Sequence, residues 1–233
     1  MPAFPVQSGS PPRLLVSVRD PAEAEAGQLA GADLIDAKDP ERGALGALDT
    51  ALVGEIVARV SGGAATSAVA DPTAAAVAAM AATGVDWVKT GLHSAHRGDA
   101  FALAELAAAV PGRLIAVLFA EDGPAADLVP TLAESGFAGA MIDTAGKQGV
   151  RLPDLTEPSE LAAFTAACRH HGLMSGLAGS LRINDIASLS AHRPDYLGFR
   201  GGLCRDFDRR NGIDPLRLTE ALRALRPSRR DAA

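Results

Sequence analysis

Short apolar runs alternate with longer segments of helical spacing along most of this chain. The apolar runs predict eight strands, and the segments between them predict helices, an alternation typical of βα units around a parallel sheet. We expect strands at 13–18, 33–37, 65–69, 86–89, 114–119, 138–142, 173–177 and 195–199, and helices at 21–30, 47–60, 72–83, 98–109, 124–135, 157–171, 181–190 and 214–226. Eight such repeats close a barrel, so the pattern predicts a single (β/α)8 TIM barrel.

Proline and glycine positions support these boundaries. Pro21 and Pro72 follow aspartates and suit the first position of a helix. Glycines 31, 84, 136 and 172 follow the expected helix ends, where a left-handed residue closes a helix. A Rossmann sheet is the alternative architecture, but no GxGxxG follows the first strand. The stretch 144–148 resembles a P-loop only faintly, because it lacks the spaced first glycine and the hydroxyl residue after the lysine.

Length and composition indicate one domain. A chain of 233 residues with 48% hydrophobic content can bury a substantial core, and it is close to the minimal size of a TIM barrel. We expect the barrel over 13–228 and a disordered tail over 1–12, which is rich in proline and serine and lacks the apolar region of a secretory signal. The alanine-rich run 73–85 is too short and too weakly hydrophobic to cross a bilayer.

Charge and cysteine content narrow the possible partners. The net charge of −6 argues against a surface for nucleic acid or an anionic membrane, so an anionic substrate must be captured by a local basic pocket. Cys168 and Cys204 are too few for a disulfide framework, which favours a reduced, cytoplasmic protein. His93 and His96 have a metal-like spacing without a further ligand nearby, so surface histidines are favoured and we expect no metal and no cofactor. We also expect a homo-oligomer.

Lysine usage carries the most chemical information. Arginine accounts for 19 of the 22 basic residues, and the only lysines are Lys38, Lys89 and Lys147. Each lysine follows a run of strand character, and the exits of barrel strands are where such enzymes place their chemistry. An arginine stays protonated, whereas a desolvated lysine can lose its proton and attack a carbonyl. The alternative is that arginine-rich coding left three lysines by accident.

The strand exits also carry carboxylates. Period-2 alternation places Asp36 and Lys38 on one face of their strand, and Lys89 and Asp143 come from the exits of two other strands. In a barrel these groups converge at one mouth, where burial and the neighbouring cation lower the pKa of a lysine and carboxylates can move protons. Two structural alternatives stay open: Asp36 and Lys38 could form a rim ion pair, and Asp143 could only orient a loop.

Glycines after the last two strands predict a phosphate site. Gly179 and Ser180 follow the seventh strand, and Arg200, Gly201 and Gly202 follow the eighth, where barrels bind phosphate through backbone N–H groups. Ser180 is expected to cap a helix over 183–189. The direction of Arg200 is left open by the alternation. The alternative is that these glycines only permit tight turns.

Taken together, six segments resemble the (5-formylfuran-3-yl)methyl phosphate synthase family of methanofuran biosynthesis. They are 14–17, 31–46, 88–92, 141–145, 177–180 and 198–204, and the resemblance runs from about residue 13 to residue 226. The D-x-K-x-P-x-x-G-x-L-G element over 36–46 is not a generic barrel motif. The family is a TIM barrel that condenses two molecules of glyceraldehyde 3-phosphate into a furan aldehyde phosphate with release of phosphate and water.

The resemblance also implies residue roles. Lys38 would form a Schiff base, Lys89 would accept a proton, and Asp36, Asp143 and Lys147 would fall on further active-site positions. The residues suit this reaction without a metal, because an imine acidifies the adjacent C–H and allows an enamine to form. Two other functions stay open: a class I aldolase acting on another phosphorylated sugar, and a non-catalytic barrel that binds a phosphorylated metabolite.

Overall fold

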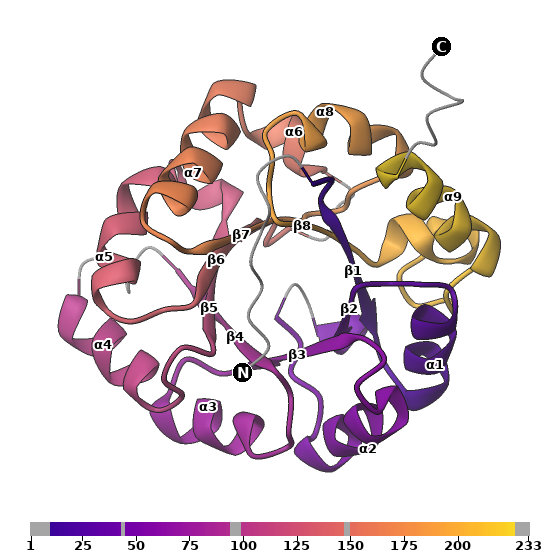
Figure 1. The fold of residues 1–233 in the computed structure, drawn as a ribbon, viewed down its shortest axis with the longest axis horizontal. Coiled ribbons are helices and arrows are strands. Elements are labelled where there is room, and N and C mark those ends of the chain that lie inside the picture. The colour runs from indigo at the N-terminus through magenta and orange to yellow at the C-terminus, as the bar shows by residue number, and fades with distance from the viewer. Residues whose placement is uncertain (1–9, 43–44, 94–98, 147–149, 227–233) are drawn as a thin grey trace.

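Eight parallel strands form a closed barrel in the computed structural model, and the helices surround it as an outer ring (Figure 1). The structure describes residues 10–42, 45–93, 99–146 and 150–226. The strands are β1 (Arg13–Val18), β2 (Leu34–Ala37), β3 (Ala65–Ala70), β4 (Trp87–Leu92), β5 (Leu114–Phe119), β6 (Gly139–Asp143), β7 (Met174–Leu177) and β8 (Tyr196–Phe199). Each strand pairs with its sequence neighbours, and β8 returns to β1, so the predicted TIM barrel is confirmed.

The outer ring contains helices of unequal length. They are α1 (Pro21–Leu29), α2 (Thr50–Val60), α3 (Ala74–Ala81), α4 (Ala100–Ala108), α5 (Val129–Glu134), α6 (Leu152–Leu155), α7 (Pro158–His170), α8 (Ile186–Ser190) and α9 (Pro215–Leu225). Short 3₁₀ turns lie at η1 (Pro40–Arg42), η3 (Ala120–Asp122), η4 (Ala126–Leu128), η5 (Ile183–Asp185), η6 (Gly201–Leu203) and η7 (Arg205–Phe207). No helix in the described residues is long and apolar enough to cross a membrane.

Alternation along the strands separates two apolar layers. In β1, for example, Leu14 and Val16 belong to the large cluster between the strands and the helices, whereas Leu15 belongs to a smaller cluster inside the barrel. The interior cluster also contains Trp87, Tyr196 and other residues of the inward face. These side chains fill the barrel below its mouth, so chemistry is confined to the C-terminal ends of the strands.

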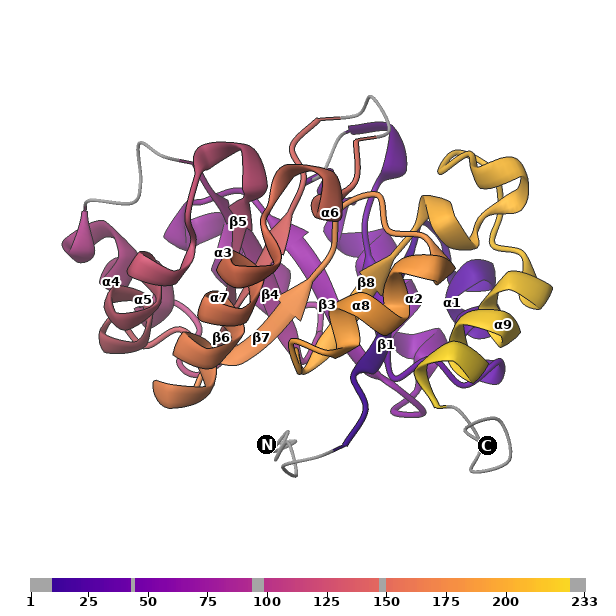
Figure 2. The ribbon, with the colours of Figure 1, turned by 90° about the horizontal axis from the view of Figure 1, so that it is seen from above.

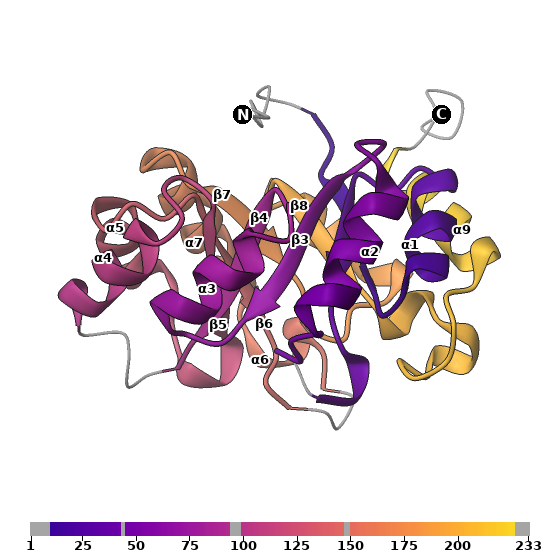
Figure 3. The same ribbon diagram turned by 90° about the horizontal axis from the view of Figure 1, so that it is seen from below.

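Aspartates fix the opposite end of the barrel. Asp33, Asp86 and Asp195 directly precede β2, β4 and β8. Each carboxylate accepts a hydrogen bond from a backbone N–H near the start of the strand before it, β1, β3 or β7. The donors are Leu14 N at 2.8 Å, Thr66 N at 2.8 Å and Ser175 N at 2.6 Å. The repeated bond sets the register of neighbouring strands. Figure 2 and Figure 3 show the end of α9 at this side, away from the loops that follow the strands.

The expected helix starts are right in one case and wrong in another. The Asp20 side chain accepts from Glu23 N at 2.8 Å, and Pro21 opens α1 as predicted. Helix α3 instead begins at Ala74, because the Thr73 hydroxyl, and not Asp71, caps it by accepting from Ala76 N at 3.2 Å. The glycines that were expected to end helices have positive φ, as predicted. The predicted tail over 1–12 falls mostly on residues 1–9, which lie outside the described residues.

Candidate active site

A cavity of about 800 Å³ opens at the C-terminal ends of the strands. Residues from β1, β2, β4, β6 and β8, and from the loops that follow β2, β6, β7 and β8, form its wall. Its charged lining comprises six basic side chains, Lys38, Lys89, Arg182, Arg200, Arg209 and Arg210, and five carboxylates, Asp36, Glu41, Asp143, Asp206 and Asp208. Acidic residues outnumber basic ones in the whole chain, so this wall is locally richer in positive charge, as capture of an anion requires.

Lys89 and Asp36 form a buried ion pair at the floor of the cavity. Lys89 Nζ lies 2.6 Å from Asp36 Oδ1, and the two side chains are 3% and 1% exposed. The carboxylate also accepts from Ser67 Oγ at 2.7 Å and from Ser17 Oγ at 3.0 Å. Three donors on three strands therefore fix Asp36, and Asp36 in turn fixes the ammonium or amine of Lys89.

The environment of Lys89 favours its neutral form. Burial is the main cause that lowers the pKa of Lys89 below its ordinary value. The positive charge of Lys38 lowers the pKa further, while the carboxylates of Asp36 and Asp143 oppose the shift without reversing it. A lysine of this kind can hold or release a proton closer to neutral pH than a surface lysine can.

Lys38 and Asp143 form a second pair, nearer the mouth. Lys38 Nζ lies 3.4 Å from Asp143 Oδ2, and the two side chains are 11% and 12% exposed. The other oxygen of Asp143 accepts from Thr144 N at 2.8 Å. The alternation placed Asp36 and Lys38 on one face, but each of them pairs with a residue from another strand. The alternative of a rim pair between Asp36 and Lys38 is therefore excluded, and two cross-barrel pairs take its place.

Lys147 lies outside the described residues. The chain that leads to it is fixed, because Glu121 accepts from Ala145 N at 3.0 Å and from Gly146 N at 2.9 Å. The role predicted for Lys147 stays a prediction.

The loop after β7 lines the cavity with backbone. No acceptor among the described residues contacts the N–H groups of Gly179 and Ser180. Gly179 has a φ of +113°, and a Cβ there would lie 2.6 Å from Thr144 Cγ2, so only glycine fits. Ser180 does not cap a helix as predicted, because the following turn is capped by Asp185, which accepts from Arg182 N at 2.8 Å.

The loop after β8 contributes a second pair of N–H groups. Gly201 and Gly202 begin η6, and their N–H groups contact no acceptor among the residues that the structure describes. A Cβ at Gly202 would lie 2.2 Å from Leu181 O, so the loops after β7 and β8 approach each other closely here. Free N–H groups from two adjoining loops are suited to an anion.

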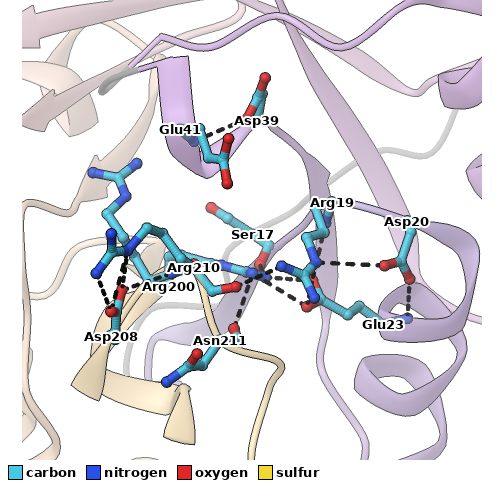
Figure 4. A network of polar contacts seen from close by, with 11 residues as sticks. Ser17, Arg19, Asp20, Glu23, Asp39, Glu41, Arg200, Asp208, Arg210 and Asn211 are labelled. Atoms are coloured by element: carbon cyan, nitrogen blue, oxygen red, sulfur yellow. Dashed lines mark hydrogen bonds and ion pairs between the residues drawn. The ribbon is translucent and has the colours of Figure 1, made fainter. Parts of the chain in front are cut away.

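Arg200 lines the cavity, but its guanidinium is turned toward protein acceptors. Figure 4 shows it between Glu23 and the backbone of the β8–α9 loop. All five of its N–H groups are accounted for by this carboxylate and three carbonyl oxygens. This geometry disfavours the direct phosphate contact predicted for Arg200, which the alternation could not settle.

Several residues near the site were not predicted. Ser17 and Ser67 could have been found, because each is a small polar residue on the inward face of a mostly apolar strand. The partnership of Glu23 with Arg200 has no sequence signal, because the two lie 177 residues apart. Tyr196 is fully buried inside the barrel, and burial raises the pKa of its phenol well above the ordinary value, so the group stays protonated.

Of the two histidines with metal-like spacing, only His93 lies in the described residues. His93 follows β4, stacks on Phe119 with the ring centroids 4.5 Å apart, and has a side chain that is 57% exposed. His96 lies outside the described residues. Within the described ranges, no group of three potential metal ligands comes together.

Fold and site together define a class of protein: a (β/α)8-barrel enzyme with paired lysines and carboxylates at its mouth. Comparison with known proteins then identifies the group within that class. The 4-HFC-P synthase family matches residues 14–222, and the chain belongs to this family. That match spans every strand except the first residue of β1.

Named relatives agree with the family. A Methylorubrum extorquens protein, whose name gives (5-formylfuran-3-yl)methyl phosphate synthase as a provisional assignment, is 59% identical over 97% of each chain. The (5-formylfuran-3-yl)methyl phosphate synthase of Methanopyrus kandleri is 34% identical over 86% of this chain and 93% of its own. That of Methanosarcina mazei is 32% identical over 82% of this chain and 90% of its own. All three names are those of a synthase of the same phosphate ester.

Solved structures share the fold at low sequence identity. The phosphoribosyl anthranilate isomerase of Thermus thermophilus superposes with a TM-score of 0.65 at 15% identity, covering 91% of this chain and 98% of its own. A 3-hexulose-6-phosphate synthase gives a TM-score of 0.62 at 15% identity, covering 91% and 99%. At such identity these neighbours support the barrel alone.

Proposed function

We propose that this protein condenses two molecules of glyceraldehyde 3-phosphate into (5-formylfuran-3-yl)methyl phosphate, with release of one phosphate and two waters, through a Schiff base on Lys38. The observation that carries the proposal is the pair of lysines at different depths of one cavity: Lys38 at 11% exposure and Lys89 at 3%. One amine can meet the substrate while the other stays beneath it.

Lys38 suits the nucleophile. Lys38 lines the cavity, and among the described residues its Nζ has one carboxylate within ion-pair distance, Asp143 at 3.4 Å, a looser contact than the 2.6 Å bond that holds Lys89. Attack of the Lys38 amine on the aldehyde gives a carbinolamine, and loss of water gives the imine. Asp143 is close enough to accept and return the protons that these two steps require.

Lys89 suits proton transfer. The imine at Lys38 acidifies the adjacent C–H, and a neutral Lys89 amine can remove that proton to leave an enamine. Burial and the Lys38 charge both lower the pKa of Lys89 and so favour the neutral form. Asp36, held by two serine hydroxyls, keeps the Lys89 amine at a fixed place.

The overall sequence is redox-neutral. One triose phosphate isomerises to its ketone form, and the enamine of one triose adds to the carbonyl of the other, forming the new C–C bond. Elimination then expels one phosphate, and ring closure with two dehydrations gives the aromatic furan, so that all atoms of the two trioses are accounted for. The chain's own residues supply the amine, the proton carriers and the anion site for this sequence.

Phosphate binding falls to the two glycine loops. Gly179, Ser180, Gly201 and Gly202 line the cavity, and their N–H groups have no protein acceptor among the described residues. Backbone N–H groups at this end of a barrel commonly bind phosphate. Gly202 and Leu181 are in close approach, so the two loops act as one surface toward the anion.

The test is a direct one. Purified protein is incubated with glyceraldehyde 3-phosphate, and the furan chromophore and released phosphate are measured against time. We expect both to appear at a ratio of one to one. A C6 sugar bisphosphate without a furan would instead indicate an aldolase, and the absence of any borohydride-reducible adduct would indicate a barrel that only binds a phosphorylated metabolite.

A further inference from the structure

The guanidinium of Arg200 is the centre of a buried polar cluster beside the cavity (Figure 4). Its Nη2 donates to Glu23 Oε1 at 3.1 Å, and its Nη1 donates to Glu23 Oε2. The two side chains are 8% and 9% exposed. A bidentate pair of this kind, shielded from water, holds its geometry far better than a surface ion pair.

The remaining donors of Arg200 hold backbone on both sides of the cavity wall. Nε donates to Arg209 O at 2.9 Å and Nη2 to Asn211 O at 3.3 Å, both in the β8–α9 loop, while Nη1 donates to Ser17 O at 3.1 Å in β1. Ser17 is also the residue whose hydroxyl donates to Asp36. One side chain therefore connects the loop after β8 to the strand that supports the lysine floor.

Glu23 is itself anchored from the loop after β1. It accepts from Arg19 N at 3.0 Å, and the Arg19 side chain donates from Nη1 to Arg210 O at 2.5 Å. The Glu23 carboxylate thus lies between the start of α1 and the β8–α9 loop. Gly201 and Gly202 directly follow Arg200 in sequence and therefore belong to the segment 200–209. The hydrogen bond from Arg200 Nε to Arg209 O joins the two ends of this segment and so restricts its conformation.

We infer that Arg200 and Glu23 are positioning residues for phosphate: their ion pair fixes the β8–α9 loop so that the N–H groups of Gly201 and Gly202 face the cavity. This inference rests on the proposed function only in taking the ligand to be a phosphate ester. Arg200 acts on the anion through the loop and does not contact it, because its five donors are already occupied.

Replacing Glu23 separates positioning from direct binding. If Arg200 bound phosphate itself, Glu23→Gln would leave the cation free of its carboxylate, and phosphate affinity would hold or increase. If the pair positions the loop, Glu23→Gln and Arg200→Lys both weaken phosphate binding, since neither a neutral amide nor a single ammonium can maintain the bidentate pair and the three carbonyl contacts.

The experiment measures inorganic phosphate binding by calorimetry, together with the KM for glyceraldehyde 3-phosphate. We expect Glu23→Gln and Arg200→Lys each to raise the Kd for phosphate and the KM for glyceraldehyde 3-phosphate about tenfold, which corresponds to ~1.4 kcal/mol, and to lower kcat much less. Glu23→Asp, which keeps the charge, should recover part of the loss. The matched control is Glu25→Gln. Glu25 lies in α1, as Glu23 does, but it forms an exposed pair with Arg59 of α2, so its replacement should leave both constants unchanged.

A second readout excludes a general loss of structure. Glyceraldehyde has the same aldehyde without the phosphate, so borohydride trapping of its imine reports on the lysines alone. We expect equal trapping of glyceraldehyde at Lys38 in wild type, Glu23→Gln and Arg200→Lys, with the adduct located by peptide mapping because Arg200→Lys itself adds a lysine. Equal loss of trapping and of phosphate affinity would overturn the inference in favour of a general structural role, as would wild-type phosphate affinity in both variants. If either variant does not fold, Glu23→Asp carries the same comparison.

Failure of this inference and failure of the proposed function are distinguishable. Wild-type protein that binds phosphate but forms no furan would overturn the proposed function, while the effects of Glu23→Gln on phosphate binding would still test the loop. Wild-type protein that forms furan, with unchanged phosphate affinity in Glu23→Gln and Arg200→Lys, would overturn only the positioning role.

Discussion

Replacing Asp36 with asparagine tests the buried floor of the site. The substitution keeps the shape of the side chain and leaves an amide oxygen for the hydroxyls of Ser17 and Ser67, but it removes the negative charge 2.6 Å from Lys89 Nζ. Because the Lys89 and Asp36 side chains are only 3% and 1% exposed, water cannot replace the carboxylate. Removing one partner of a buried pair costs about 3–5 kcal/mol of folding stability.

The loss of folding stability in Asp36→Asn should depend on pH, and the pKa of Lys89 determines the direction of that dependence. The pKa of Lys89 in the folded protein is already lower than its ordinary value, chiefly through burial. The folded state therefore loses this proton at a lower pH than the unfolded state, and stability rises with pH between the two values. Asp36 opposes the lowering, so removing it moves the folded pKa down again and begins the rise earlier. The penalty should be largest in acid and shrink as the pH increases.

Two measurements check this prediction. Urea unfolding followed by circular dichroism gives the free energy of unfolding at pH 6 and pH 9, and ¹³C,¹⁵N-lysine labelling gives only three side-chain signals to titrate. The matched control measures Asp36→Asn in a Lys89→Met background, against Lys89→Met alone; with the titrating amine removed from both proteins, the penalty should be the same at both pH values. A penalty in Asp36→Asn that does not change with pH, with an unshifted Lys89 titration, would refute the assigned environment of Lys89.

Four further substitutions test the proposed roles and the loop after β7. Lys89→Ala should lower turnover at least about a hundredfold, the scale of general acid–base catalysis, while borohydride still traps some adduct at Lys38; turnover at the wild-type level would return Lys89 to a structural role. Lys38→Arg should abolish furan formation despite the retained charge, because a guanidinium forms no imine, and measurable turnover would contradict that role. Gly201→Val should raise the KM for glyceraldehyde 3-phosphate and the inhibition constant of phosphate. The fold should stay intact by circular dichroism, because a Cβ at Gly201 meets only ordinary contacts at 3.6 Å or more. An unchanged inhibition constant would place the phosphate site elsewhere. Gly179→Val should instead lower the melting temperature, because a side chain at Gly179 requires a strained φ and displaces Thr144; an unchanged melting temperature would show that the loop relaxes.

Local pattern was sufficient for the barrel and for the convergence of its candidate site residues on one cavity. Period-2 alternation and the recurring helical segments predicted all eight strands to within a few residues, because inward and outward faces of a barrel strand have different partners. Alternation put Asp36 and Lys38 on one face, and the strand-exit positions of Lys89 and Asp143 brought all four to one cavity. The helix starts were less certain, since Asp71 and Thr73 are both competent caps and only the packed structure selects Thr73.

The pairing of charged groups could not be predicted from local pattern. Asp36 lies two residues from Lys38 but pairs with Lys89, because Lys38 extends beyond the last residue of β2 toward Asp143, while Lys89 lies within β4 at the level of the floor. The direction of Arg200 depends on Glu23, which is distant in sequence and meets it only because β8 closes the barrel against β1. Ser180 was expected to cap a helix, yet its positive φ and the Asp185 cap exclude that role.

The most direct test of the central claim is the site of covalent attachment. Borohydride reduction in the presence of glyceraldehyde 3-phosphate should add the mass of one reduced triose phosphate to one peptide, and fragmentation should place it on Lys38. The chain offers only two other lysines, so the assignment is unambiguous. An adduct on Lys89 or Lys147 would contradict the division of roles between the paired lysines, and no adduct under turnover conditions would contradict the Schiff-base mechanism itself.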